Sequence, residues 1–397
     1  MHTDDRWKSL TVRSDVRFYD AQPGREFLYR PSHLLVSPRF EDDVRGRLQR
    51  LGVGVDHHVS SSVASCFHLA NADVDALELT ARLWHDEGVD AGAASAAATV
   101  AGAGGATGTA RGPSVGVNHI FVGEPVYAFG PADAPHPIDP MPDAVHETHR
   151  VLPGAGVTVL VLDTGMAHPD SAGSDRDPLD DHPRDGLLDA QAGHGTFVAD
   201  VIRRIAPGAE IDVKRVLDGD GVVDEYTLVT ALDGCQADIV NLSLGGFTAG
   251  DTPPIALAKA IAALDRRIAV VAAAGNESRA RPFWPAALKR VVSVAAVDRN
   301  GAPAPFSNRG WWVDACALGV DVRAEFVSGA EMVDGRRTDF DGWAQWSGTS
   351  FAAPHVAAAI AVWMWQHPGS TAAESAFDLL QAGYPTDLIA DFGVRVA

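Results

Sequence analysis

The chain has 397 residues, of which 46% are hydrophobic and 21% charged, and this is an ordinary balance for a globular protein of two or three domains. Its 52 acidic residues outnumber the 32 basic ones and give a formal net charge of −20. Because this charge would repel both nucleic acid and anionic membranes, we expect neither of them as a partner.

The N-terminal residues contain no apolar run after a basic start, and no run of 18 or more strongly apolar residues occurs in the chain. The cysteines, Cys66, Cys235 and Cys316, are too few and too scattered for a disulfide framework, and no metal-ligand spacing is visible. These features predict a cytoplasmic protein with reduced thiols and no metal site. Secretion by a route that leaves no mark in the sequence stays open.

Residues 1–32 show no clear period, and we treat them as an N-terminal extension. From residue 33 the hydrophobic pattern alternates between strand-like and helix-like periods. We expect strands at 33–36, 53–60, 63–70 and 115–122, and helices at 41–51 and 74–84. Residues 91–112 are almost entirely Ala, Gly, Ser and Thr, which is typical of a mobile insertion. The order β-α-β-β-α-β predicts a small α+β domain of ferredoxin-like type over residues 33–122.

Residues 123–150 hold six prolines and are expected to form a linker. From 151 to 397, apolar runs typical of buried strands alternate with helical patterns. We expect strands at 157–162, 210–216, 239–243, 268–273 and 291–297, with helices at 197–205, 226–234, 255–265 and 372–380. This alternation predicts an α/β domain with a doubly wound, mainly parallel sheet.

Near the C-terminal end, the small residues Gly348 and Thr349 precede Ser350, which should lie in the first turn of a helix that runs to residue 363. The unpaired N–H groups and the positive end of this helix would surround the Ser350 hydroxyl. A serine held in this way suits nucleophilic attack on a carbonyl, because the developing negative oxygen meets preformed donors. The simpler interpretation is that Ser350 only caps the helix.

Three other polar residues fall at strand ends or helix starts, where open α/β sheets place their sites. Asp163 closes a buried strand in an Asp-Thr-Gly motif, His194 opens a helix in a Gly-His-Gly-Thr motif, and Asn276 follows Ala-Ala-Ala-Gly. Each residue taken singly is more often a turn or solvated residue. Their occurrence together with Ser350, on one α/β pattern, favours a common site.

These motifs resemble those of the subtilisin-like serine peptidases (the subtilase family), and the resemblance covers residues 157–365. The Asp-Thr-Gly, Gly-His-Gly-Thr and Gly-Thr-Ser-Phe-Ala-Ala-Pro-His blocks are specific in combination, and Asn-Leu-Ser-Leu-Gly-Gly at 241–246 and Phe-Ser-Asn-Arg-Gly at 306–310 support them. The resemblance implies a serine endopeptidase that requires no cofactor. Ser350 would be its nucleophile, His194 the general base and acid, Asp163 the residue that orients His194, and Asn276 the side-chain donor of the oxyanion hole.

The resemblance also implies a protein or peptide substrate that binds as an added strand along Ser243, Leu244 and Gly245. Small residues beside Asn276 would leave room for a pocket. They are Ala273, Ala274 and Gly275. We therefore predict a broad, mainly apolar preference next to the cleaved bond.

The predicted domain at 33–122 is similar to the inhibitory propeptide of this family. The chain's own N-terminal domain should then act as an inhibitor in cis until the chain is processed between about residues 123 and 150. A permanent accessory domain is the alternative.

Two segments, 314–317 and 326–345, depart from the family pattern and could reshape specificity. The acidic loop 175–181 could hold a structural Ca²⁺, although such loops are more often only solvated. Two other functions stay open. One is a serine-carboxyl-type acid peptidase with a glutamate base, although His194 in its Gly-His-Gly-Thr motif is evidence against it. The other is a catalytically silent binding scaffold with a subtilase-like fold.

Overall fold

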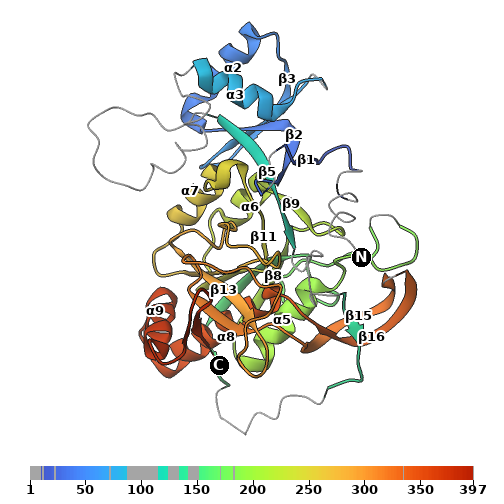
Figure 1. The fold of residues 1–397 in the computed structure, drawn as a ribbon, viewed down its shortest axis with the longest axis vertical. Coiled ribbons are helices and arrows are strands. Elements are labelled where there is room, and N and C mark those ends of the chain that lie inside the picture. The colour runs from blue at the N-terminus through green and yellow to red at the C-terminus, as the bar shows by residue number, and fades with distance from the viewer. Residues whose placement is uncertain are drawn as a thin grey trace. The chain divides into compact units, whose positions relative to one another are not determined.

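The computed structural model describes residues 10, 13–21, 24–70, 73–86, 115–123, 134–141, 152–169, 171–181, 184–333 and 335–396. The chain forms two compact units (Figure 1). One unit comprises Met1–Phe121, Asp224–Cys235 and Gly246–Leu264, and the other comprises Val122–Val223, Gln236–Gly245 and Asp265–Ala397. The predicted insertion at 91–112 and most of the predicted linker at 123–150 lie outside the described residues.

The first unit contains an antiparallel sheet in which the strands follow the spatial order β5-β2-β4-β3. These strands are β2 (Phe27–Val36), β3 (Val55–Ser60), β4 (Ser65–Leu69) and β5 (Val115–Gly123), of which β5 belongs to this unit up to Phe121. Helices α2 (Glu41–Arg50) and α3 (Ala76–Asp86) pack against the sheet around a core that includes Leu34, Leu48, Phe67 and Leu83 (Figure 1). The element order is the predicted β-α-β-β-α-β, with the strand arrangement of a ferredoxin-like domain.

Strand β2 begins at Phe27, six residues before the strand predicted from the sequence. Its first residues pair with β1 (Arg17–Tyr19), and the rings of Tyr19 and Phe27 stack at 4.9 Å. The register of β2 against β5 shifts between Arg30 and Leu34, around Pro31. Proline cannot donate a ladder hydrogen bond, so it interrupts the period that sequence analysis depends on.

Two helices from the C-terminal half of the sequence complete the first unit. They are α6 (Glu225–Leu232) and α7 (Ile255–Ala263), and two short 3₁₀ turns, η1 (Pro38–Phe40) and η3 (Ala249–Asp251), lie in the same unit. Asp224 caps α6 by accepting a hydrogen bond from the Thr227 backbone N–H at 3.0 Å. A carboxylate at this position also complements the positive end of the helix dipole.

The second unit is built on a sheet with the order β17-β18-β14-β13-β12-β10-β7-β8, eight strands in the described part of the chain. All neighbours pair in parallel except β17 and β18. The strands are β7 (Thr158–Asp163), β8 (Glu210–Arg215), β10 (Ile239–Leu242), β12 (Ala269–Ala273), β13 (Val291–Val297), β14 (Ala315–Leu318), β17 (Leu388–Ile389) and β18 (Gly393–Arg395). The predicted mainly parallel, doubly wound sheet is confirmed, and burial of both faces explains its nearly continuous apolar strands.

The strand order reverses at β7, because the chain passes first to β8 on one side and then to β10 on the other. Asp163 is the last residue of β7, so it lies at the point of the sheet where doubly wound folds place their ligand sites. Helix α8 (Thr349–Gln366) packs against β10, β12, β13 and β14 and against α5 (His194–Ile205). Helix α9 (Ala372–Gly383) follows and begins with a capping box formed by Thr371 and Glu374.

The segment before the serine motif, which departs from the family pattern, forms a long hairpin of β15 (Val322–Val333) and β16 (Arg336–Trp346). The short strand β6 (His136–Pro137) pairs with β16 at Ala344 and Gln345. Three aromatic side chains of this hairpin are buried, and Phe326 packs against both Phe340 and Trp346. Among the described residues, no helix is both long enough and apolar enough to cross a membrane.

Candidate active site

Asp163 and His194 form a buried pair in the second unit. Asp163 ends β7, and His194 is the first residue of α5. His194 Nδ1 lies 2.8 Å from Asp163 Oδ1 and 3.0 Å from Oδ2, and both side chains are fully buried. A carboxylate is an acceptor only, so Nδ1 donates to it, and in the neutral ring Nε2 then carries the lone pair that a general base requires.

The glycines of the two motifs let this pair approach. A Cβ atom on Gly195 would lie 2.3 Å from the backbone oxygen of Gly165. Gly165 has a positive φ of 98°, and a Cβ there would lie 2.8 Å from the backbone nitrogen of Asp177. The Asp-Thr-Gly and Gly-His-Gly-Thr motifs therefore contact each other directly, and larger residues at these positions would force them apart.

Asp177 connects the same two motifs. Its Oδ2 accepts hydrogen bonds from Thr164 Oγ1 and from the Gly193 backbone N–H, each at 2.9 Å. Thr164 Oγ1 in turn accepts from the Gly195 N–H at 3.1 Å. Burial raises the pKa of the Asp177 carboxyl, while these hydrogen bonds favour its charged form. From the sequence, Asp177 was expected only as part of an acidic loop, because no spacing distinguishes it from its acidic neighbours.

Ser350, the second residue of α8, is buried and bonded to Ser243. Its Oγ donates to the Ser243 carbonyl at 3.1 Å, and Ser243 Oγ donates to the Ser350 carbonyl at 2.7 Å. Asn241 Nδ2 donates to Ser243 Oγ at 2.9 Å. The Asn-Leu-Ser motif at the end of β10 thus contacts the serine motif at the start of α8.

The ring of His194 is enclosed by aromatic residues on the serine side. The centroid of Trp346 lies 5.5 Å away in an edge-on arrangement, and that of Phe351, the residue after Ser350, also lies at 5.5 Å. His194 therefore contacts both Asp163 and Phe351, although Asp163 and Ser350 lie 187 positions apart in the sequence (163 to 350). Trp346 was not predicted as part of this group.

Asn276 is held beside the residue that precedes Ser350. Its Oδ1 accepts from the Thr349 N–H at 2.9 Å and from Thr349 Oγ1 at 3.0 Å, and the Gly275 N–H donates to Thr349 Oγ1 at 3.0 Å. Because Thr349 holds the amide oxygen of Asn276, the NH₂ group of Asn276 points away from these Thr349 donors. Thr349 therefore sets the orientation of Asn276, a role that the sequence alone did not reveal.

Asn308, from the Phe-Ser-Asn-Arg-Gly motif, supports the loop that carries Asn276. Its Nδ2 donates to the Ala274 carbonyl at 2.9 Å, and its Oδ1 accepts from the Arg279 N–H at 2.7 Å. Gly275 has a positive φ of 96°, and a Cβ there would lie 2.3 Å from Asn308 Nδ2. The loop can pass Asn308 only with glycine at this position.

The predicted substrate-pairing segment is already paired with part of this chain. Strand β11 (Leu244–Gly245) lies antiparallel to the last two residues of β5, with Leu244 opposite Gly123 and Gly245 opposite Val122. Gly123 N–H also donates to the carbonyl of Gly221, just before β9 (Val222–Asp224), at 2.8 Å. Val122 and Gly123 therefore bond on one side to β11 and on the other to Gly221. The small residues expected beside a pocket, Ala273 and Ala274, are fully buried.

Known proteins are similar to this chain in sequence. The sequence profile of the Subtilase family matches residues 154–384. Subtilisin BL and Subtilisin Savinase of Lederbergia lenta are each 32% identical to this chain over 237 residues, covering 55% of this chain and 80% of the relative. Among solved structures, a cold adapted subtilisin-like serine proteinase aligns with a TM-score of 0.47 at 25% identity, over 67% of this chain and 96% of that one. The family match defines a serine-type endopeptidase. This chain belongs to the subtilase family.

Proposed function

We propose that this chain hydrolyses peptide bonds with Ser350 as nucleophile, His194 as general base and acid, and Asp163 as the residue that orients His194. The observation that carries the proposal is the buried Asp163–His194 pair. The ring of His194 also contacts Phe351, the residue after Ser350. Because these side chains supply base, nucleophile and orientation, the reaction requires no cofactor. The substrate class is protein or peptide.

In this mechanism Ser350 Oγ attacks the carbonyl carbon of the scissile bond while His194 Nε2 takes its proton. Asp163 stabilises the imidazolium that forms, and His194 then protonates the leaving amine. A water molecule, deprotonated by His194, hydrolyses the resulting ester on Ser350. The Asn276 NH₂ group and the Ser350 backbone N–H would donate to the oxyanion, and each such donor contributes on the order of 3 kcal/mol to the transition state.

The N-terminal domain acts as an inhibitor in cis in this proposal. Support comes from Val122 and Gly123, which pair with β11 where an added substrate strand would pair. A segment held there excludes substrate by occupying its main-chain partners. Processing would then occur on the C-terminal side of Gly123.

A fluorophosphonate probe tests the nucleophile, because it reacts with an activated serine and reports the site by mass. Wild-type protein should be labelled at Ser350, and Ser350→Ala should not be labelled. Unlabelled wild type with a correctly folded spectrum would instead favour a silent binding scaffold. Hydrolysis restricted to acid pH would favour a serine-carboxyl-type mechanism, because a histidine base must be unprotonated to act.

Mass spectrometry of the purified chains tests the inhibition in cis. Wild type should lose an N-terminal fragment ending beyond Gly123, whereas Ser350→Ala should keep its full mass. Equal intact masses would leave the N-terminal unit as a permanent accessory domain. A peptide library should show a broad apolar preference beside the cleaved bond, and a strict basic preference would contradict that prediction.

A further inference from the structure

Three potential ligands converge on one face of the sheet in the first unit. His33 of β2 lies directly opposite His68 of β4, and Cys66 precedes His68 by two residues. Because side chains alternate along a strand, Cys66 and His68 point to the same face, which is also the face of His33. The ligand atoms of these three residues lie within 4.8 Å of one another.

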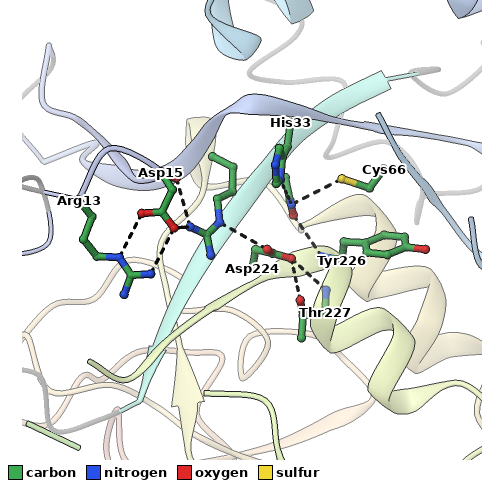
Figure 2. Close-up of polar contacts among 9 residues, drawn as sticks. Arg13, Asp15, His33, Cys66, Asp224, Tyr226 and Thr227 are labelled. Carbon is green, nitrogen blue, oxygen red and sulfur yellow. Dashed lines mark hydrogen bonds and ion pairs between the residues drawn. The ribbon is translucent and has the colours of Figure 1, made fainter. Parts of the chain in front are cut away.

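The contacts of Asn118 show that two of these atoms face a single point. Asn118 Nδ2 lies 3.4 Å from His33 Nδ1 and 3.9 Å from Cys66 Sγ. Figure 2 shows the His33 ring and the Cys66 sulfur turned toward this point, near Asp224 at the start of α6. An amide N–H is a weak partner for a thiol and an imidazole, and a soft cation would bind the same lone pairs more strongly.

The residue types suit one class of metal. Zn²⁺ binds both Cys sulfur and His nitrogen in tetrahedral geometry, so two imidazoles and one thiolate can hold it and leave a fourth position for water. Burial, reinforced by neighbouring His68, lowers the pKa of His33 to about 4, so its ring is neutral near pH 7. Burial and the nearby Asp224 carboxylate raise the pKa of the Cys66 thiol to about 12, so the ion has to displace the thiol proton when it binds. The resulting thiolate and Asp224 would then balance the charge of a divalent ion.

The required movement is small. Ligand atoms of a tetrahedral Zn²⁺ site lie about 3.5 Å apart, since the metal–ligand distances are about 2.1 and 2.3 Å. From a separation of up to 4.8 Å, rotation of the side chains has to close roughly 1 Å. His33 and His68 are only partly buried and can rotate, while the ring of His57 stacks on His68 with a centroid distance of 3.8 Å and supports it from the far side.

We propose that His33, Cys66 and His68 bind one Zn²⁺ ion and thereby link β2 to β4 in the first unit. The sequence showed no metal-ligand spacing because strand register, not spacing along the chain, brings His33 to the Cys-x-His pair. An ion that binds only the folded sheet would stabilise this unit by mass action.

Cobalt binding to the full chain tests the site, in the Ser350→Ala background so that no self-digestion occurs. We expect one Co²⁺ per chain, a thiolate-to-cobalt charge-transfer band in the near ultraviolet and visible bands of tetrahedral intensity. Competing Zn²⁺ should displace the cobalt and remove these bands. Stoichiometric binding without the charge-transfer band would overturn the proposal, and so would the absence of binding.

Substitutions then assign the ligands. Cys66→Ser should abolish the charge-transfer band and weaken Zn²⁺ binding by at least about tenfold, since the loss of outer-shell partners alone costs 10- to 100-fold. Cys235→Ser, which removes another thiol of the same unit, is the matched control and should bind as the parent does. Equal affinity of the two variants would refute the site. If circular dichroism shows that Cys66→Ser is unfolded, His68→Asn takes its place, because His68 is partly exposed. Zn²⁺ affinity equal to that of Cys235→Ser would then refute the site.

Discussion

Ser243 and Ser350 bind each other through two hydrogen bonds of opposite direction. Ser350 Oγ donates to the Ser243 carbonyl at 3.1 Å, and Ser243 Oγ donates to the Ser350 carbonyl at 2.7 Å. Ser243 directly precedes β11, the strand with which Val122 and Gly123 pair. The position of the proposed nucleophile is therefore tied to the segment that is expected to carry the substrate.

The first prediction concerns these two hydrogen bonds between Ser243 and Ser350. Ser243→Ala leaves the buried carbonyl of residue 350 and the Asn241 amide without the Ser243 hydroxyl as a partner. A buried polar group that loses its hydrogen bond costs about 1–3 kcal/mol, so the free energy of unfolding should fall by that amount. Urea unfolding in the Ser350→Ala background measures the change. Ser328→Ala on β15, where the serine is exposed, should cost far less, and equal losses would contradict the prediction.

The second prediction concerns Thr349, whose hydroxyl fixes the amide of Asn276. Thr349→Val keeps the shape and the backbone N–H but removes the hydroxyl contacts with Asn276 Oδ1 and the Gly275 N–H. We expect kcat to fall about tenfold with KM nearly unchanged. The misplaced Asn276 amide would weaken a hydrogen bond that is made only in the transition state, so substrate binding is hardly affected. Losing the donor altogether costs about 10²- to 10³-fold, a value that comes from subtilisin, a relative of this chain.

A double-mutant cycle distinguishes this orienting role from a general loss of stability. Once Asn276→Ala has removed the donor, adding Thr349→Val should lower kcat little further, because residues that act as one unit are not additive. If the two losses multiply in full, Thr349 acts independently of Asn276.

The strands and the four proposed catalytic residues could be predicted because their signals are local. A buried parallel strand requires a continuous apolar run, and the motif glycines are required by close approaches such as that between Gly195 and Gly165. Each motif therefore carries its own physical cause within a few residues. The placement of these motifs at strand ends and helix starts follows the general rule for doubly wound sheets.

Supporting residues could not be predicted, because their roles depend on contacts between distant segments. Asp177 resembles its acidic neighbours in sequence, yet it alone accepts from both Thr164 and Gly193. The grouping of His33 with Cys66 depends on strand register, which the sequence leaves open wherever turns and bulges intervene. The early start of β2 was hidden by Pro31, which breaks the expected period.

The third prediction uses the raised pKa of Asp177. Its folded-state pKa lies above the unfolded value of about 3.9, so the folded state holds the proton more tightly. The Asp177 contribution to stability is therefore largest below that value and declines as the pH rises through the folded pKa. Asp177→Asn cannot ionise and lacks this decline.

Thermal unfolding of both chains in the Ser350→Ala background measures this difference. Asp177→Asn should be less stable throughout, because it replaces one carboxyl oxygen by an NH₂ group, which cannot accept a hydrogen bond. The difference in stability between parent and variant should narrow as the pH rises above about 4, the unfolded-state pKa, and passes through the raised folded-state pKa. A gap that widens over this range would mean that the pKa of Asp177 is lowered and not raised.

The fourth prediction tests whether the pairing of Gly123 with β11 controls activity. A Cβ atom on Gly123 would lie 2.8 Å from Leu217 Cδ1 and 3.3 Å from Gln191 Oε1, so Gly123→Val cannot keep this position without displacing its neighbours. Because the pairing of Val122 and Gly123 with β11 is then weaker, a fluorophosphonate probe should label the uncut chain faster. Self-cleavage should be slower, because it needs the same segment aligned along β11.

Gly116→Val is the matched control, because Gly116 lies on the same strand and a Cβ there would meet nothing within 4 Å. Valine also favours a strand conformation, so any effect of β propensity is common to both variants. If the Gly116 variant changes labelling and self-cleavage as much as the Gly123 variant, the effect belongs to the whole domain. If neither variant changes them, the pairing at β11 does not restrain the enzyme.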